Sequence, residues 1–294
     1  MNKIRLFEMF AGYGGASFAL KKANIPFECV GFSEIKTNAK KLYMQNHKGY
    51  NYGDCTQINP NELPDFDLLT GGFPCQDVSI AGKNDLRKGR TILFNEIIRI
   101  AEIKQPNYML LENVKGITFK NHKLFFEYVK NELKRLGYYV QIRLLKSSDY
   151  GTPQKRERVF FICSKNNTMV TLTKTPLLYK LKDLLDDIVD EKYYLKEADL
   201  WKLENKRYRF YNITDNCINT LTAGHLRGWD DPRIKIGNRY RYLTPKERFR
   251  FMGFFNDEIN IDGLSESGSA DLSGNGWDIN LVSKIFKEMF KNKI

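Results

Sequence analysis

Short apolar runs alternate with amphipathic stretches through the first half of the chain, and this alternation limits the folds that it can adopt. We expect strands at 4–10, 27–32, 66–70, 108–111, 138–145 and 159–163. The spacing of apolar residues between them predicts helices at 16–23, 36–46, 92–103 and 123–136. Because alternating strands and helices join parallel strands, the sequence predicts an α/β fold with a doubly wound, mostly parallel sheet that is covered on both faces.

A polar break at 164–167 ends this pattern and divides the chain into three expected segments. Residues 1–164 form the first domain, 165–240 form a small basic domain of irregular β structure, and 241–294 return to complete the first domain. Between 202 and 241 the chain holds nine lysines and arginines but only four aspartates and glutamates, with aromatic residues among them. Helical spacing recurs at 181–188, and a last apolar stripe at 282–290 is expected to pack on the first domain.

The chain has 294 residues and a net charge of +12, which favours a polyanionic partner. No apolar run approaches the length of a membrane-spanning helix, and the first residues lead into a strand instead of a signal-peptide core. The five cysteines and three histidines are scattered and lack the spacing of a metal or redox site. We therefore expect a cytoplasmic protein with no membrane contact and no metal.

Two reactive side chains follow predicted strands. Cys75 comes after the run at 66–70 and a Gly-Gly turn, and Glu112 comes directly after the run at 108–111. Ligands of parallel sheets bind beyond the carboxyl ends of the strands, so we expect a nucleophile and an acid in one active site. Taken singly, Cys75 could be a buried structural thiol and Glu112 a helix-capping carboxylate, but their occurrence together favours catalysis.

A glycine-rich turn at 10–15 follows the first strand and opens the first helix. Glycines permit a tight turn and a close approach of a ligand, and the helix N-terminus offers free amides. Glu34 ends the second strand about twenty residues on, where a carboxylate can bind ribose hydroxyls. Asp54, at the end of a further expected strand, could accept a bond from an adenine amino group. The spacing predicts a nucleoside-containing cofactor and leaves NAD and S-adenosylmethionine both open.

Taken in chain order, these motifs resemble those of the DNA cytosine-5 methyltransferase family. The resemblance runs from residue 3 to about 290 and rests on residues 10–15, 72–76, 112–114, 154–158, 242–254 and 274–277. The segment at 165–240 matches weakly and corresponds to the target recognition domain of the family. At 276–277 the chain has Gly-Trp where the family usually has Ser-Val.

The resemblance implies a Rossmann-like methyltransferase that uses S-adenosylmethionine to methylate carbon 5 of cytosine. Cys75 would add to carbon 6 as a thiolate, which breaks the aromaticity of the ring and makes carbon 5 nucleophilic. Glu112 would contact ring nitrogen 3, Arg158 would hold the carbonyl oxygen of the base, and Arg156 with Arg158 would favour the thiolate. The implied cofactor contacts are Phe10, Ala11, Gly12, Gly14, Gly15, Glu34, Asp54, Pro74, Leu93 and Asn275.

Duplex DNA is the substrate that the resemblance implies, with the target base flipped out of the helix. The implied DNA contacts are Phe73, Gln76, Ser79, Lys83, Arg87, Lys88 and Arg90 near the nucleophile, and Thr222, Arg227, Trp229 and Arg233 in the recognition segment. A short recognition sequence, a monomeric state and a companion restriction enzyme are further expectations.

Three other interpretations are open. A tRNA cytosine-5 methyltransferase on the same scaffold would carry the same motifs, and comparing methyl transfer to duplex DNA and to tRNA would discriminate the two. A catalytically inert DNA-binding relative would be expected to have lost Cys75 or Glu112, and both are present. An NAD-dependent redox enzyme would leave these two residues without a role.

Overall fold

The chain divides into two compact units in the computed structural model, which describes residues 3–73, 91–200, 209–224 and 231–292. Unit 1 comprises Met1–Leu145, Glu157–Leu172 and Ser283–Ile294. Unit 2 comprises Lys146–Arg156 and Thr173–Val282. The chain therefore passes between the units four times.

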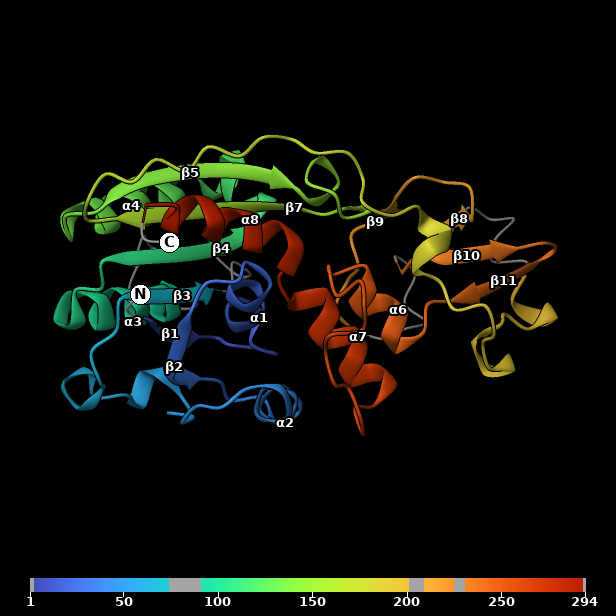
Figure 1. The fold of residues 1–294 in the computed structure, drawn as a ribbon, viewed down its shortest axis with the longest axis horizontal. Helices are drawn as coiled ribbons and strands as arrows, with labels where there is room; N and C mark the ends of the chain where they lie inside the picture. Colours follow the sequence, from blue (N-terminus) through green and yellow to red (C-terminus); the bar gives the residue numbers. More distant parts are fainter. Residues whose placement is uncertain (1–2, 74–90, 201–208, 225–230, 293–294) are drawn as a thin grey trace. The chain divides into compact units, whose positions relative to one another are not determined.

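Unit 1 is built on a six-stranded sheet with the order β2-β1-β3-β4-β7-β5 (Figure 1). The strands β2, β1, β3 and β4 are parallel neighbours, and β7 pairs antiparallel with β4. The bounds of these strands are β1 Ile4–Met9, β2 Phe27–Ser33, β3 Leu68–Gly72, β4 Tyr108–Val114, β5 Tyr139–Lys146 and β7 Glu157–Ser164.

Helices cover both faces of this sheet because successive side chains of a strand point to opposite sides. Phe7 and Met109 lie in one apolar cluster with residues of α3 and α4. Their chain neighbours face the other side, where Glu8 bonds to α1 and Tyr108 contacts Phe290 of α8 at a ring distance of 5.0 Å. The α-helices are α1 Gly15–Lys22, α2 Thr37–Asn46, α3 Thr91–Lys104, α4 Lys123–Arg135 and α8 Ile279–Phe290, and the short 3-10 helices are η1 Cys55–Gln57, η2 Pro60–Glu62, η3 Lys115–Thr118 and η4 Lys120–His122.

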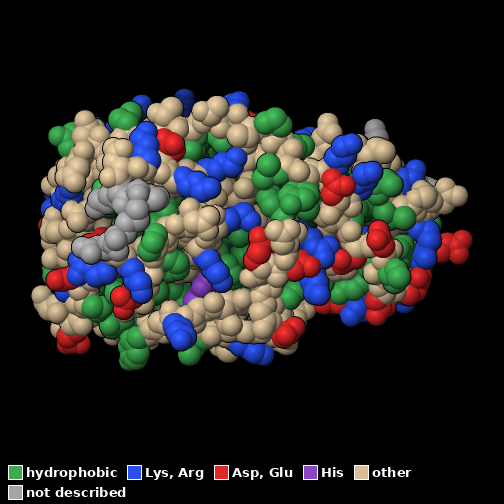
Figure 2. Space-filling view, viewed as in Figure 1, with side chains coloured by type: hydrophobic (Ala, Val, Ile, Leu, Met, Phe, Trp, Pro, Cys, Tyr) green, Lys and Arg blue, Asp and Glu red, His purple; other side chains and the backbone are tan. Residues whose placement is uncertain are grey.

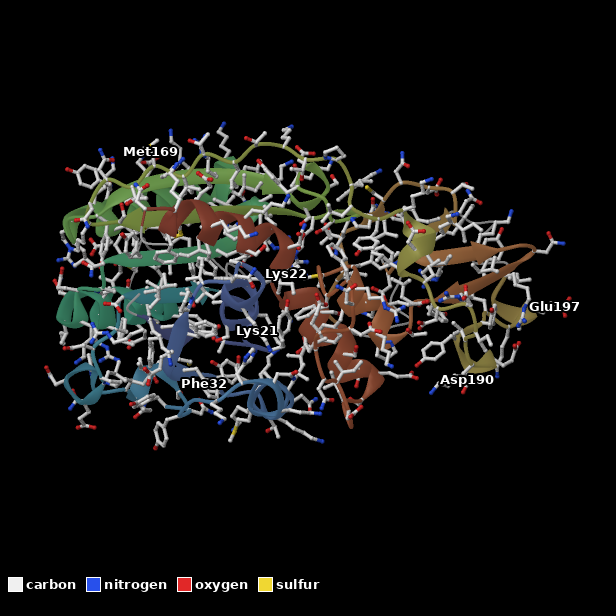
Figure 3. All side chains as sticks on the ribbon, in the orientation of Figure 1. Lys21, Lys22, Phe32, Met169, Asp190 and Glu197 are labelled. Carbon is white, nitrogen blue, oxygen red and sulfur yellow. The ribbon has the colours of Figure 1, made fainter. Side chains whose placement is uncertain are left out.

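Local sequence accounts for the ends of these helices. Gly14 precedes α1 with a left-handed backbone, φ 84°, which favours glycine. Lys21 and Lys22 occupy the last turn of the same helix (Figure 3), where cations interact favourably with the helix dipole. Beyond α4, Gly137 has φ 81° and ends the amphipathic stretch.

The described residues of unit 2 form two small sheets and two α-helices. One sheet has the order β11-β10-β8, and the other pairs β6 with β9 in parallel. Thr244 caps α6 through a reciprocal capping box with Glu247, and Pro245 is the first residue of that helix. The elements are η5 Ser147–Asp149, β6 Gln154–Lys155, η6 Leu181–Leu184, η7 Glu191–Tyr193, η8 Glu197–Asp199, β8 Phe210–Asn212, β9 Ile218–Asn219, β10 Arg233–Ile236, β11 Arg239–Tyr242, α6 Pro245–Arg250 and α7 Glu266–Asn275.

The expected α/β fold with a mostly parallel sheet is confirmed. The division of the chain differs from the expected one, because residues 241–282 belong to unit 2 and only Ser283–Ile294 return to unit 1. A buried ion pair within unit 2 explains part of this, since Arg248 of the expected return segment donates to Asp231 of the preceding segment at 2.5 Å. The helix expected at 181–188 is limited to the 3-10 turn η6.

Candidate active site

The glycine-rich turn after β1 has the backbone that its sequence predicts. Phe10, Gly12 and Gly14 all have positive φ values, of 52°, 57° and 84°. A positive φ is uncommon for a residue with a side chain and is found at ligand-binding turns, so Phe10 holds a strained position. A Cβ atom built on Gly12 would meet nothing within 4 Å, which shows open space over this turn. The turn can therefore receive a ligand close to its backbone.

Glu34 lies directly after β2 and faces this turn. Its Oε2 accepts a hydrogen bond from the Gly12 amide at 2.9 Å, and its Oε1 accepts from the amides of Ile35 and Lys36 at 2.9 and 2.8 Å. The carboxylate thus fixes the turn and the chain just before α2, and each of its oxygens has two acceptor sites. Ile35 beside it is 65 % exposed. Sequence reasoning did not single out this exposed apolar residue beside Glu34.

Asp54 is placed near the same strand end, but not by a strand of its own. Residue Asn51 forms an isolated bridge with Phe32, and the Ser33 hydroxyl donates to the Gly53 carbonyl at 2.7 Å. Asp54 caps the short helix η1, and its Oδ1 accepts bonds from the amide and the hydroxyl of Thr56, both at 2.9 Å. The prediction of a strand that ends at Asp54 was wrong, because this segment bonds to β2 at isolated positions and does not form a ladder with it.

A buried polar cluster lies under the turn and was also missed by sequence reasoning. Glu8 is 2 % exposed and accepts hydrogen bonds from the Ser17 hydroxyl, the Ala16 amide and the Tyr43 hydroxyl. Burial raises the pKa of Glu8 to about 7, and these donors offset part of the rise. The available signal was an acidic residue inside an otherwise apolar strand. Tyr43 stacks on Phe32 of β2, which is labelled in Figure 3, so the cluster joins β1, α1 and α2.

A second group of side chains lies at the carboxyl end of β4. The Arg158 guanidinium donates to the Glu112 carboxylate at 2.7 Å, and both side chains are largely buried. Antiparallel pairing of β4 and β7 produces this contact, because it sets Arg158 opposite Val114. Asn113 donates to the Phe73 carbonyl at 2.9 Å and so fixes the chain just past β3. Phe73 is itself buried in the apolar cluster, against Phe94, Phe125 and Phe161.

Arg156 does not join this group. It belongs to unit 2, is 1 % exposed, and donates to the carbonyls of Leu221, Gly274 and Gly276 at 3.4, 3.0 and 2.6 Å. These bonds support a structural role and do not support the expected effect on a thiolate. Of the two arginines of the motif, Arg156 lies between β6 and β7 and belongs to unit 2, whereas Arg158 lies on β7 in unit 1 and pairs with Glu112.

The described recognition residues, Arg233 and Thr222, differ in exposure. Arg233 is fully buried, donates to the Asp231 carbonyl at 2.6 Å and lies 5.2 Å from the ring centre of Tyr242. This burial is at odds with reading base edges, because the guanidinium bonds to groups in the interior of unit 2. Thr222 is exposed. Asn275, an expected cofactor contact, also has an exposed side chain, which donates to Asp271 at 2.8 Å within α7.

Leu93 is half-buried on α3 against the main apolar cluster, whereas Ala11 and Gly15 are buried in and after the glycine-rich turn. The remaining expected site residues lie outside the described residues, namely Cys75, Pro74, Gln76, Ser79, Lys83, Arg87, Lys88, Arg90, Arg227 and Trp229. Across the described ranges, no group of histidine, cysteine and acidic residues could hold a metal ion. Within the same part of the chain, every helix is too short or too polar to cross a membrane.

The described residues form an α/β fold with a glycine-rich turn after β1 and an arginine–glutamate pair at the end of β4. Comparison with known proteins makes the assignment specific, because the profile of the C-5 cytosine-specific DNA methylase family matches residues 4–291. The chain belongs to this family and is a DNA (cytosine-5-)-methyltransferase, which confirms the resemblance. Members of the family are S-adenosylmethionine-dependent.

Individual relatives agree with this assignment. The type II methyltransferase M2.ScrFI of Lactococcus lactis subsp. cremoris is 31% identical over 99% of this chain and 100% of its own length. The type II methyltransferase M.NlaX of Neisseria lactamica is 32% identical over 97% of this chain and 96% of its own length. Among solved structures, S. pombe Dnmt2 methyltransferase superposes with a TM-score of 0.84 at 20% identity, covering 99% of both chains. This last similarity shows the fold alone.

Proposed function

We propose that the chain methylates carbon 5 of a cytosine flipped out of duplex DNA, with Cys75 as the nucleophile. The observation that carries this proposal is the pair of Glu112 and Arg158, joined at 2.7 Å at the end of β4. Glu112 is paired in register with Gly72, the last residue of β3. Cys75 follows Gly72 by three residues, a stretch of at most about 11 Å. The nucleophile is therefore tethered near the acid.

The other four cysteines support this choice of nucleophile. Burial raises the pKa of Cys29 to about 12 and that of Cys55 to about 11. It also raises the pKa values of Cys163 and Cys217. Because the thiolate is the reactive form, these four thiols are poor nucleophiles at neutral pH.

The proposed reaction uses Cys75, Glu112 and Arg158. The Cys75 thiolate forms a bond to carbon 6, and the ring electrons move toward nitrogen 3, where Glu112 supplies a proton or a hydrogen bond. Arg158 orients the Glu112 carboxyl and can donate to the carbonyl oxygen of the base. Carbon 5 then takes the methyl group, its proton leaves to a base, and the bond from carbon 6 to sulfur breaks to release Cys75.

The residues around the glycine-rich turn fit a nucleoside cofactor. When bound, S-adenosylmethionine supplies the methyl group. The second acceptor site of Glu34 Oε2 can take a ribose hydroxyl, and the exposed Asp54 can accept from an adenine amino group. Phe10 and Ile35 offer apolar surface for the purine, and the open space over Gly12 permits close approach of the chain atoms.

The DNA partner is supported by charge. Figure 2 shows lysine and arginine side chains spread over the visible face, in keeping with the net charge of +12. A stacked base cannot reach a buried carboxyl such as Glu112, so the target must leave the duplex, at a cost of a few kcal/mol. Residues 83–90 would contribute phosphate contacts. The naming of relatives as type II methyltransferases supports a companion restriction enzyme, and we propose a monomer.

Covalent trapping tests the nucleophile. Duplex DNA that carries 5-fluorocytosine should form a stable adduct with the protein when S-adenosylmethionine is present, because fluorine cannot leave carbon 5 as a proton does. Cys75→Ala should abolish the adduct, whereas Cys217→Ala should retain it as the matched control. Trapping by Cys75→Ala would refute the assignment. Parallel methyl-transfer assays on duplex DNA and tRNA decide between the proposed substrate and the tRNA alternative.

A further inference from the structure

A pocket within unit 2 combines basic and polar side chains from segments that are distant in the sequence. Its volume is about 380 Å³, and its described lining consists of Lys155, Arg209, Asn219, Thr220 and Thr222. Lys155 lies on β6 and is paired in register with Asn219 on β9. Arg209 directly precedes β8. The size is near the lower end of the range for ligand pockets, about 300–1,000 Å³.

The backbone that forms one wall of this pocket is held from below by buried side chains. The Leu221 amide donates to Gln154 Oε1 at 3.1 Å, and the fully buried Arg248 donates to the Thr222 carbonyl at 2.9 Å. Arg248 is held in turn by Asp231 at 2.5 Å. Because these supporting groups are themselves buried and paired, the wall is held in one position and is preorganised.

Gly274, in the last turn of α7, completes this support. A Cβ atom on Gly274 would lie closer than 3.0 Å to the backbone of Thr222 and Ala223. Real Cβ atoms essentially never approach this closely, so the segment can pass over α7 only because residue 274 is glycine. The glycine of the motif at 274–277 thus allows the wall of the pocket to pack on α7.

The polar groups of the pocket favour an anion. The Thr220 hydroxyl donates to the Lys155 carbonyl at 3.1 Å, and the Thr222 hydroxyl faces Asp231, whose pKa is raised by burial and lowered in part by Arg248 and Thr222. The remaining donors of the described lining are the ammonium of Lys155, the guanidinium of Arg209 and the side-chain amide of Asn219. This described lining includes no carboxylate. A base edge presents donors as well as acceptors, whereas a phosphate presents acceptors alone.

We propose that this pocket binds one backbone phosphate of duplex DNA, through Lys155, Arg209 and Asn219. The proposal rests on the proposed DNA substrate and adds a contact that sets the register of the duplex on unit 2. A phosphate contact positions the protein without reading sequence, so its loss has a signature that differs from the loss of a base contact.

Binding of a fluorescent duplex, measured by anisotropy over a series of KCl concentrations, tests the pocket. Lys155→Ala and Arg209→Ala should each weaken binding by the same factor on a duplex with the methylated site and on an unrelated duplex. The slope of log K against log salt should become less negative by about 0.9 for each lost contact. Lys182→Ala, an exposed lysine of unit 2 outside the described lining, is the matched control and should change neither quantity.

The outcomes separate the pocket from the proposed function. Unchanged affinity and slope in both variants would overturn the phosphate site, even if the parent protein methylates DNA. A change in which sites are methylated would instead identify Arg209 or Lys155 as base readers and would also overturn it. If the parent protein methylates tRNA and not duplex DNA, the proposed substrate is wrong, and the proposed site for a DNA phosphate is wrong as well.

A second variant tests the support of the wall. Gly274→Ala should weaken duplex binding, and adding Arg209→Ala to it should have little further effect, because the displaced wall no longer holds the phosphate against the guanidinium. Gly116→Ala is the matched control, since a Cβ atom there would make only an ordinary contact with Val114 at 3.7 Å. Full additivity of the two losses would refute the role of Gly274. Thermal unfolding and S-adenosylmethionine affinity, measured in parallel, show that the variants are folded.

Discussion

Replacing Glu8 with glutamine should change how the stability of the protein depends on pH. The Glu8 carboxyl is 2 % exposed, under the glycine-rich turn, and burial raises its pKa from an ordinary value of 4.5 to about 7. The bonds from Ser17, Tyr43 and the backbone amides of α1 lower this pKa and so limit the rise. The glutamine side chain has the same shape and carries no charge at any pH.

The raised pKa fixes both the sign and the size of the effect. The folded state prefers the neutral carboxyl, so Glu8 contributes its full stabilisation below pH 4.5 and loses it as the pH rises through about 7. The interval between these two pKa values corresponds to about 3 kcal/mol, at about 1.4 kcal/mol for each pKa unit. We therefore expect the free energy of unfolding to fall by about this amount between pH 4.5 and 8 through Glu8 alone.

A neighbouring histidine opposes this trend. Burial, with Lys21, lowers the pKa of His47 from 6.5 to about 4, so His47 destabilises the folded state as the pH falls through this range. Cys29 has a pKa of about 12, and that of Tyr43 is raised further, so both stay neutral. The contribution of His47 cancels when the parent protein and Glu8→Gln are compared at each pH. The difference between the two proteins is therefore the informative quantity.

Urea unfolding at intervals from pH 5 to 8.5 measures this difference. Relative to the parent protein, Glu8→Gln should gain stability as the pH rises, by up to about 3 kcal/mol across the window. Glu28→Gln, an exposed glutamate on β2, is the control and should follow the parent curve. A constant difference between Glu8→Gln and the parent protein at every pH would show that Glu8 is charged in both states, and would refute the reasoning.

Three further predictions concern the site itself. Glu34→Ala should weaken S-adenosylmethionine binding by about 1–3 kcal/mol in calorimetry, the scale of a lost bond to a charged group, and an unchanged affinity in a folded variant would contradict the assignment. Arg158→Ala should lower kcat by about 10²–10³-fold while leaving cofactor affinity intact, because Glu112 loses the cation that orients it. Gly14→Ala should lower the thermal stability more than Gly53→Ala does. At both positions the positive φ costs an alanine about 1–2 kcal/mol, but only at Gly14 would the new Cβ meet His47, at 2.5 Å.

Much of unit 1 follows from the sequence because its pattern is local and repeated. The strands and helices up to β7 lie within a few residues of their expected bounds, since period-2 and period-3.6 patterns reflect burial on this sheet. The exceptions depend on contacts between distant residues. Asp54 was expected at the end of a strand, but its segment touches β2 through one bridge at Asn51 and not through a ladder.

Unit 2 was less predictable because some of its charged side chains are buried and bond to groups inside the unit. The excess of lysine and arginine at 202–241 was interpreted as a surface for DNA, yet Arg233 and Arg241 are fully buried. Their partners, the Asp231 carbonyl and Glu247, are set by tertiary structure, which spacing along the chain does not reveal. Arg156 and Arg158 are likewise not distinguished by sequence spacing. They belong to one motif, but Arg156 bonds within unit 2 and Arg158 bonds within unit 1.

The four passages of the chain between the units have a consequence for synthesis on the ribosome. The helix α8 supplies Phe290 to the sheet face beside Tyr108, so unit 1 lacks part of its core until residue 290 has been made. After β1 to β4 have emerged, the part of that face beside Tyr108 stays uncovered while the residues of unit 2 are translated. A nascent chain of this kind is exposed to aggregation for most of its synthesis, and slow translation or a chaperone that shields the face would increase the yield of folded protein.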